Sequence, residues 1–114
     1  MWRDEAYLLD ILIAARKVSR YVEGVSWESF KEDDRTQDAV IRNLQIIGEA
    51  AHKLSNEFQS GHPEVPWGEI IGMRHRLVHD YSRINVAKVW ETAQDDIPLL
   101  IRWIEPLVPP EDQV

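Results

Sequence analysis

The chain contains no cysteine among its 114 residues, which excludes disulfide bonds, thiolate metal ligands and a cysteine nucleophile. It also lacks a long apolar run, because Asp10 interrupts the hydrophobic stretch near the N-terminus. The sequence therefore predicts neither a signal peptide nor a membrane span. Together these absences favour a reducing compartment, and we expect a cytoplasmic protein that does not bind membranes.

Basic residues are in the minority: 13 Lys and Arg stand against 20 Asp and Glu, a formal net charge of −7. General binding to nucleic acid rests on clustered positive charge, so the overall balance argues against a general nucleic-acid binder. The window 71–90 differs, because it holds four basic residues and one acidic residue, a charge of +3 against −10 elsewhere. Such a basic island directs an anionic substrate to one place. A chance fluctuation in charge is the alternative explanation.

Hydrophobic residues make up 44% of the chain and recur with helical spacing, whereas no segment alternates with a period of two. This pattern predicts an all-α protein, an up-down bundle of four main helices with a further short helix after Ser26. We expect one helical domain over 1–109 and a disordered tail over 110–114. The four helices are expected at about 3–22, 34–58, 67–81 and 86–108.

Single residues refine these boundaries. Gly24 should end the first helix, and Gly48 should let a neighbouring helix approach the second one closely. Asn85 is a good N-cap for the last helix. Pro98 lies within that helix and removes a backbone hydrogen bond, so the chain should kink or break near 94–98.

The main polar cluster is the octet RHRLVHDY at 74–81, which combines Arg74, His79 and Tyr81. A permanently charged guanidinium, an imidazole that titrates near neutrality and a phenol suit the handling of phosphate. We expect the octet at the C-terminal end of the third helix. There Arg74 and His79 would lie roughly 140° apart around the axis, so they would not share a face. The alternative is an ordinary solvated helix face.

A metal site is a second hypothesis for the same histidines. His75 and His79 are four residues apart, which is the spacing of two metal ligands on a helix. A third ligand would have to be Asp80, His52 or His62, and the spacing places none of them. We therefore expect surface histidines, with no metal and no cofactor.

The motif Arg74-x4-His79-x-Tyr81 and its flanks resemble HEPN-domain toxins of the HepT family. The segments NLQIIGEAA at 43–51, PWGEIIGMR at 66–74, VWE at 89–91 and DIP at 96–98 match that family in order. The resemblance implies a small all-α, metal-independent ribonuclease that acts as a homodimer, with the two motifs at the interface. It also implies an antitoxin partner, an MntA-like nucleotidyltransferase that transfers AMP onto Tyr81.

The resemblance assigns roles to the octet. His79 is expected to move protons while the ribose 2′-hydroxyl attacks phosphorus and leaves a 2′,3′-cyclic phosphate. Arg74 is expected to bind the phosphate, and AMP on Tyr81 would neutralise the cationic site and block RNA. A dimer would let Arg74 and His79 converge across a two-fold axis. Three further residues are candidates for holding the RNA backbone: His75, Arg76 and Arg83.

Two polar residues of the second helix, Asn43 and Glu49, are further candidates for the same site. Two other hypotheses stay open. The chain could be a non-catalytic HEPN module that partners a nucleotidyltransferase and presents it with substrate or nucleotide. It could also be a structural bundle whose octet is only surface.

Overall fold

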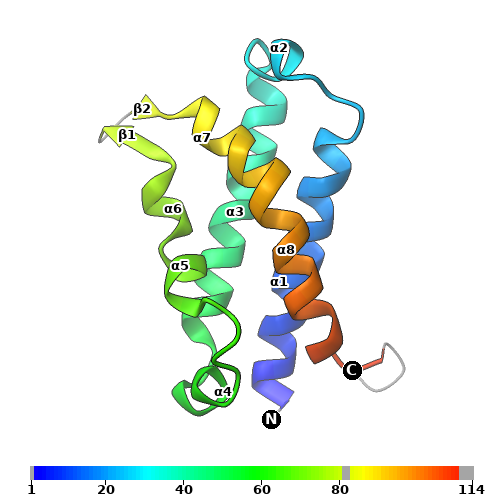
Figure 1. Ribbon diagram of the computed structural model, residues 1–114, viewed down its shortest axis with the longest axis vertical. Coiled ribbons are helices and arrows are strands. Elements are labelled where there is room, and N and C mark those ends of the chain that lie inside the picture. The colour runs from blue at the N-terminus through cyan, green and yellow to red at the C-terminus, as the bar shows by residue number, and fades with distance from the viewer. Residues whose placement is uncertain (1, 81–82, 111–114) are drawn as a thin grey trace.

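The computed structural model describes residues 2–80 and 83–110, with six residues described by backbone only: Trp2, Arg74, Arg76, Val78, His79 and Asp80. The molecule measures 42 × 30 × 20 Å. Three helical segments run along the long axis: α1 (Trp2–Val22), α3 (Asp34–Lys53) and the unit that ends in α8 (Ile97–Ile104). Figure 1 shows these three segments side by side, with the shorter elements attached at the ends and along one edge.

The core forms where α1 packs against both α3 and α8. Most residues of the apolar stripes expected from helical spacing are buried, each at most 8% exposed: Leu8, Ile11, Leu12, Ala15, Val18, Val22, Val40, Leu44, Ile47, Ala51, Leu54, Ala93, Ile97, Leu100 and Ile104. Four residues near the ends of the expected stripes are half-buried against this core: Phe58, Val86, Trp90 and Val108. Each fully buried Leu, Ile or Val side chain contributes about 1.5–3 kcal/mol. The spacing of apolar residues thus predicted the core faces correctly.

The link from α1 to α3 follows local sequence signals. Gly24 has φ +71°, a conformation that side-chain-bearing residues rarely adopt, so it ends α1 as expected. The predicted short helix is α2 (Trp27–Phe30), whose N-cap Ser26 accepts a hydrogen bond from the Ser29 N–H at 3.1 Å. Phe30 is fully buried, and its ring centroid lies 5.0 Å from that of Trp90.

The second long helix is shorter than predicted. α3 ends at Lys53 and does not continue to Phe58. Ser55 starts a separate helix, α4 (Asn56–Gly61), and its hydroxyl accepts a hydrogen bond from the Phe58 N–H at 3.0 Å. The Asp4 carboxylate on α1 accepts two hydrogen bonds from Ser55, one from its N–H at 2.9 Å and one from its hydroxyl at 2.8 Å. A tertiary contact from the first turn of the chain thus supports the break.

The third predicted helix also breaks, and the expectation of a helical octet was wrong. The chain forms α5 (Trp67–Ile71), α6 (Met73–Arg76) and then an antiparallel hairpin of β1 (Val78–Asp80) and β2 (Arg83–Ile84). The Asn85 N–H donates to the Leu77 carbonyl at 2.7 Å, which closes the hairpin at its base. Because Leu77 is only 1% exposed, its burial pins the point where the helix gives way to the strand.

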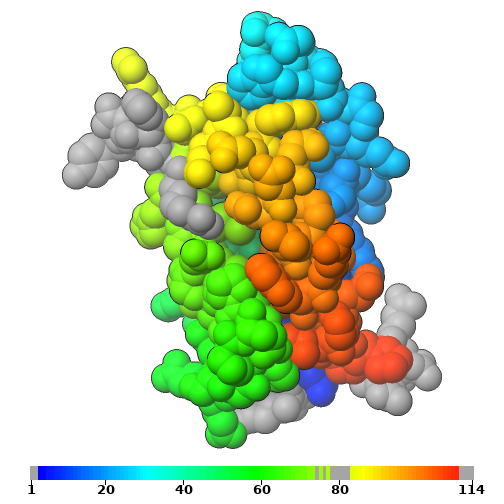
Figure 2. All heavy atoms as spheres, viewed as in Figure 1, coloured from blue at the N-terminus to red at the C-terminus, as the bar shows by residue number. Residues whose placement is uncertain are grey.

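The last helix begins and bends as predicted. It comprises α7 (Val86–Glu91), a π-helical turn (Thr92–Asp96) and α8, followed by a 3₁₀ turn (Glu105–Leu107). The π turn ends two residues before Pro98, whose missing N–H cannot continue the α-helical bond pattern. Figure 2 shows this segment, yellow to orange, running across one face beside the green α4–α5 region.

The all-α prediction is confirmed, since the small hairpin is the sole departure from helix and turn among the described residues. No helix within residues 2–80 and 83–110 combines the length and apolarity that crossing a membrane requires. Of the predicted disordered tail, residues 111–114 lie outside the described residues.

Candidate functional site

The structure places the motif at the junction between α6 and the hairpin. Arg74 belongs to α6 and His79 to β1, and Tyr81 lies outside the described residues. Figure 1 shows the described strands projecting from one edge of the bundle. The 140° separation expected on one helix does not apply, because the chain changes from helix to strand between Arg74 and His79.

The backbone that carries Arg74 and His79 is anchored on both sides. Before and after Arg74, the side chains of Met73 and Leu77 are buried at 3% and 1% exposure. Burial of these two side chains fixes α6 against the core, so the motif backbone has a defined position on the fold.

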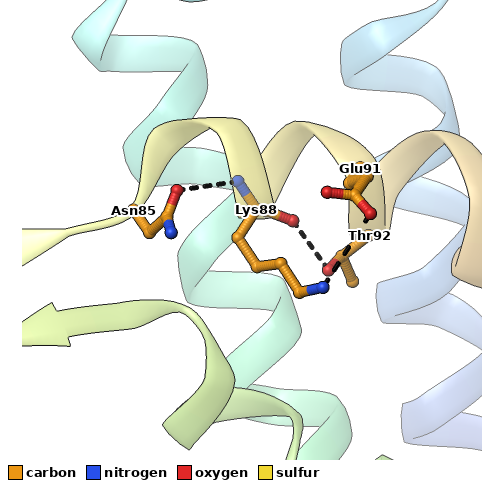
Figure 3. A network of polar contacts seen from close by, with 4 residues as sticks. All are labelled: Asn85, Lys88, Glu91 and Thr92. Carbon is orange, nitrogen blue, oxygen red and sulfur yellow. Dashed lines mark hydrogen bonds and ion pairs between the residues drawn. The ribbon is translucent and has the colours of Figure 1, made fainter.

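On the far side of the hairpin, Asn85 connects β2 to α7. Its backbone N–H holds the hairpin base, while its side-chain oxygen accepts a hydrogen bond from the Lys88 N–H at 3.0 Å (Figure 3). One turn later the Thr92 hydroxyl donates to the Lys88 carbonyl at 2.8 Å, and the Lys88 ammonium lies 3.8 Å from the Glu91 carboxylate. The hairpin and the start of the last helix therefore form one connected unit.

A polar recess lies next to the motif, between α3 and the α5–α6 segment. It has a volume of about 340 Å³ and is lined by Gln45, Gly48, Glu49, His52, Ile71 and His75. Gly48 allows this arrangement: a Cβ built on it would lie 3.3 Å from the Ile71 carbonyl oxygen. The predicted close approach of a helix to Gly48 is therefore confirmed, and the helix is α5.

The recess unites two sequence candidates, Glu49 and His75, from separate elements. His52 joins them, and Gln45 was not identified from the sequence. The sequence could have identified Gln45, because positions 45, 49 and 52 follow helical spacing and share one face of α3. Within the part of the chain that the structure describes, no hydrogen bond or ion pair engages the side chains of these four residues. Their polar groups are free to meet a ligand.

Two other candidates lie elsewhere. Asn43 is 6% exposed, and its amide donates to the Ala39 carbonyl one turn earlier at 2.9 Å, so it serves α3 itself. Arg83 is exposed in β2, paired in register with Asp80 of β1. The side chains of Arg74, Arg76 and His79 lie outside the described residues, and their roles stay predictions.

The described residues contain no group of three or more His, Asp or Glu side chains placed to hold a metal ion. His52 and His62, two of the third ligands considered for a histidine pair, lie on different elements. His52 lines the recess at the end of α3, whereas His62 follows α4 and packs against Phe58, with ring centroids 4.5 Å apart and the rings tilted by 37°.

Known proteins are similar to this chain along nearly its whole length. A protein of Thermococcus cleftensis named "Probable ribonuclease HepT" is 43% identical over 94 residues, which cover 82% of this chain and 86% of the relative. A relative from Caldanaerobacter subterraneus subsp. tengcongensis, whose name describes an RNase, is 39% identical over 92% of this chain and 94% of its own length. A third, from Methanocaldococcus jannaschii and also named as an RNase, is 35% identical over 89% of this chain and 93% of the relative.

No solved structure matches the chain. The model of the family described as "Ribonuclease HepT-like" matches residues 11–107, a span that includes all of α3, the recess, the motif and α8. With the helical fold, the anchored motif segment and these relatives in agreement, the chain belongs to the HepT-like ribonuclease family.

Proposed function

We propose that this protein is an endoribonuclease that acts as the toxin of a toxin–antitoxin pair. The observation that carries the proposal is family membership over a span that contains the motif Arg74-x4-His79-x-Tyr81. The relatives named as ribonucleases and the anchored position of the motif backbone support it. The basic island at 71–90, on an otherwise acidic chain, gives RNA one favourable place to bind.

The proposed reaction is transesterification within RNA. His79 accepts the proton of the ribose 2′-hydroxyl while that oxygen attacks the adjacent phosphorus. The bond from phosphorus to the 5′-oxygen breaks, the protonated His79 of a second copy of the chain donates a proton to the leaving oxygen, and a 2′,3′-cyclic phosphate forms. Arg74 binds the phosphate oxygens, where its planar fork stabilises the charge that develops on them. The reaction as written needs only residues of the chain itself.

The test is cleavage of RNA by the purified chain and by His79→Ala. We expect the variant to lose at least about 100-fold in rate, since a positioned general base contributes about 10²–10⁴-fold. His62→Ala is the matched control, because His62 lies beyond α4 and outside the recess. Equal cleavage by wild type and His79→Ala would refute the role of His79. Products that carry a 3′-phosphate from the start, without a cyclic intermediate, would refute the proposed reaction.

The same proposal gives Tyr81 a regulatory role. A nucleotidyltransferase partner would join the tyrosine oxygen to the α-phosphorus of ATP, releasing pyrophosphate and the phenolic proton. The added phosphate places negative charge and bulk beside the motif, which repels RNA. Mass spectrometry after incubation with the nucleotidyltransferase and ATP should find AMP on wild type and none on Tyr81→Phe. Adenylate on another residue would refute this role.

We further propose that the active species is a homodimer with the two motifs facing one another. The change from helix to strand removes the helical argument for convergence across a two-fold axis, so this proposal rests on family membership. Light scattering should give twice the 13.3 kDa mass of the chain. A monomer that cleaves RNA at full rate would exclude the dimer as a requirement.

A further inference from the structure

The recess between α3 and the α5–α6 segment has a chemistry that differs from the motif beside it. Among the described residues that line it, none is lysine or arginine, and Glu49 is the one carboxylate. The Glu49 carboxylate accepts hydrogen bonds and offers none to the oxygens of a phosphate. An uncharged ligand with hydrogen-bond donors fits this set of groups.

The recess lies next to the motif segment that is expected to bind RNA. His75 stands between Arg74 and Arg76 in the chain and lines the recess, so a ligand held there lies next to the backbone of the segment expected to bind phosphate. Proteins read single-stranded RNA by stacking its bases on flat side chains and bonding their Watson–Crick edges. Two imidazole rings, from His52 and His75, offer such flat surfaces, and Ile71 adds apolar contact. The volume of about 340 Å³ is within the range of small-molecule sites.

We propose that the recess binds a guanine base of the RNA substrate, next to the phosphate that is cleaved; this inference rests on the ribonuclease function proposed above. Guanine presents two adjacent donors on its Watson–Crick edge, N1–H and the N2 amino group, which match the two oxygens of Glu49. Adenine and cytosine present one amino group beside an acceptor nitrogen, and uracil presents one N–H between two carbonyls. The Gln45 amide, one turn before Glu49, can donate to guanine O6.

Gly48 is part of the lining of the recess. A side chain at this position would project toward the backbone of α5, because a Cβ built there would lie 3.6 Å from the Ile70 carbonyl oxygen and 3.3 Å from that of Ile71. The glycine therefore lets α3 and the end of α5, which both line the recess, lie close together.

The experiment compares cleavage of RNA oligonucleotides that differ only in the base beside the cleaved phosphate: guanine, adenine or hypoxanthine, which lacks the N2 amino group. Wild type should prefer guanine over adenine by about tenfold or more, the discrimination typical of a two-bond contact. Glu49→Gln should bring the ratio of the two rates close to one. Glu32→Gln is the matched control, since it makes the same change on an exposed residue after α2 and should keep the preference. Hypoxanthine should fall between the other two bases.

A second measurement decides the inference even if the protein cleaves no RNA. Guanosine 5′-monophosphate, added to the wild-type chain, should shift the imidazole NMR signals of His52 and His75, whereas adenosine 5′-monophosphate should shift them less. The His62 signal is an internal control outside the recess. Absence of both shifts, or equal shifts with the two nucleotides, would overturn the guanine site. Equal cleavage at guanine and adenine, or an unchanged preference in Glu49→Gln, would overturn it while leaving the ribonuclease function intact.

Discussion

Substitution of Gly48 tests how closely the motif segment is held against the core. A Cβ at this position would lie 3.3 Å from the Ile71 carbonyl oxygen and 3.6 Å from that of Ile70. Gly68 on α5 is the matched control, because a Cβ built there meets nothing within 4 Å. Both glycines lie in helices, so the two alanine variants differ mainly in the contact that the new methyl group makes.

The expected magnitudes follow from two opposing effects. Replacing glycine by alanine inside a helix stabilises the folded state by up to about 1 kcal/mol. At Gly48 the shorter contact opposes this gain, since overpacking costs about 1–3 kcal/mol. We therefore expect Gly68→Ala to be more stable than wild type by about 0.5–1 kcal/mol. Gly48→Ala should lie between no change and about 2 kcal/mol of destabilisation.

Thermal and urea unfolding, followed by circular dichroism and tryptophan fluorescence, measure this difference. For a chain of this size 1 kcal/mol corresponds to about 4 °C in Tm, so the expected gap of at least about 0.5 kcal/mol between the two alanine variants corresponds to at least about 2 °C. Gly48→Val adds two methyl groups at the contact and should be less stable still. If Gly48→Ala raises Tm as much as Gly68→Ala does, the close approach of α5 to α3 is refuted.

Three further predictions concern residues that hold the elements in place. Asp4→Ala removes a 7%-exposed carboxylate that accepts two hydrogen bonds from Ser55. Urea titrations should show a free energy of unfolding lower by about 2–3 kcal/mol. A loss below about 0.5 kcal/mol would refute the contact. Asn85→Ala removes the N-cap of α7 and should lower the free energy of unfolding by about 1 kcal/mol in the same titration. An unchanged free energy of unfolding would count against the cap. The Thr36 hydroxyl and then its N–H hold the pKa of Asp33 below 3.8, so this carboxylate stabilises the fold above that pH and the effect is lost as pH falls through the lowered pKa. The Tm difference between wild type and Asp33→Asn should accordingly shrink below pH 3.8, and a constant difference would contradict the assignment.

The accuracy of the sequence-based predictions depended on the range of the interactions involved. Helix ends set by one residue and its neighbours were predicted well, as Gly24 and the N-cap Asn85 show. The break before Ser55 was missed, although serine is a good N-cap, because the apolar spacing continues to Phe58. What favours the break in the folded protein is Asp4, which is 51 residues away in the chain.

The octet shows the same limit at the candidate site. Its residue types indicated phosphate chemistry, and the flanking segments indicated the family that the comparisons then showed. Its helical spacing predicted the wrong local structure, because burial of Leu77 and its hydrogen bond to Asn85 turn the chain into a hairpin. A pattern of apolar residues cannot reveal a bond between two backbone groups on either side of a turn.

The sequence by itself determined the all-α class, the buried faces of the long helices, the kink before Pro98 and the motif residues, because each depends on composition or on neighbours within a few positions. Only the tertiary structure decided that α3 ends early, that the motif spans a helix and a strand, and that Glu49, His52 and His75 share one recess. These features depend on contacts between distant segments, whose free energy appears only when the helices pack.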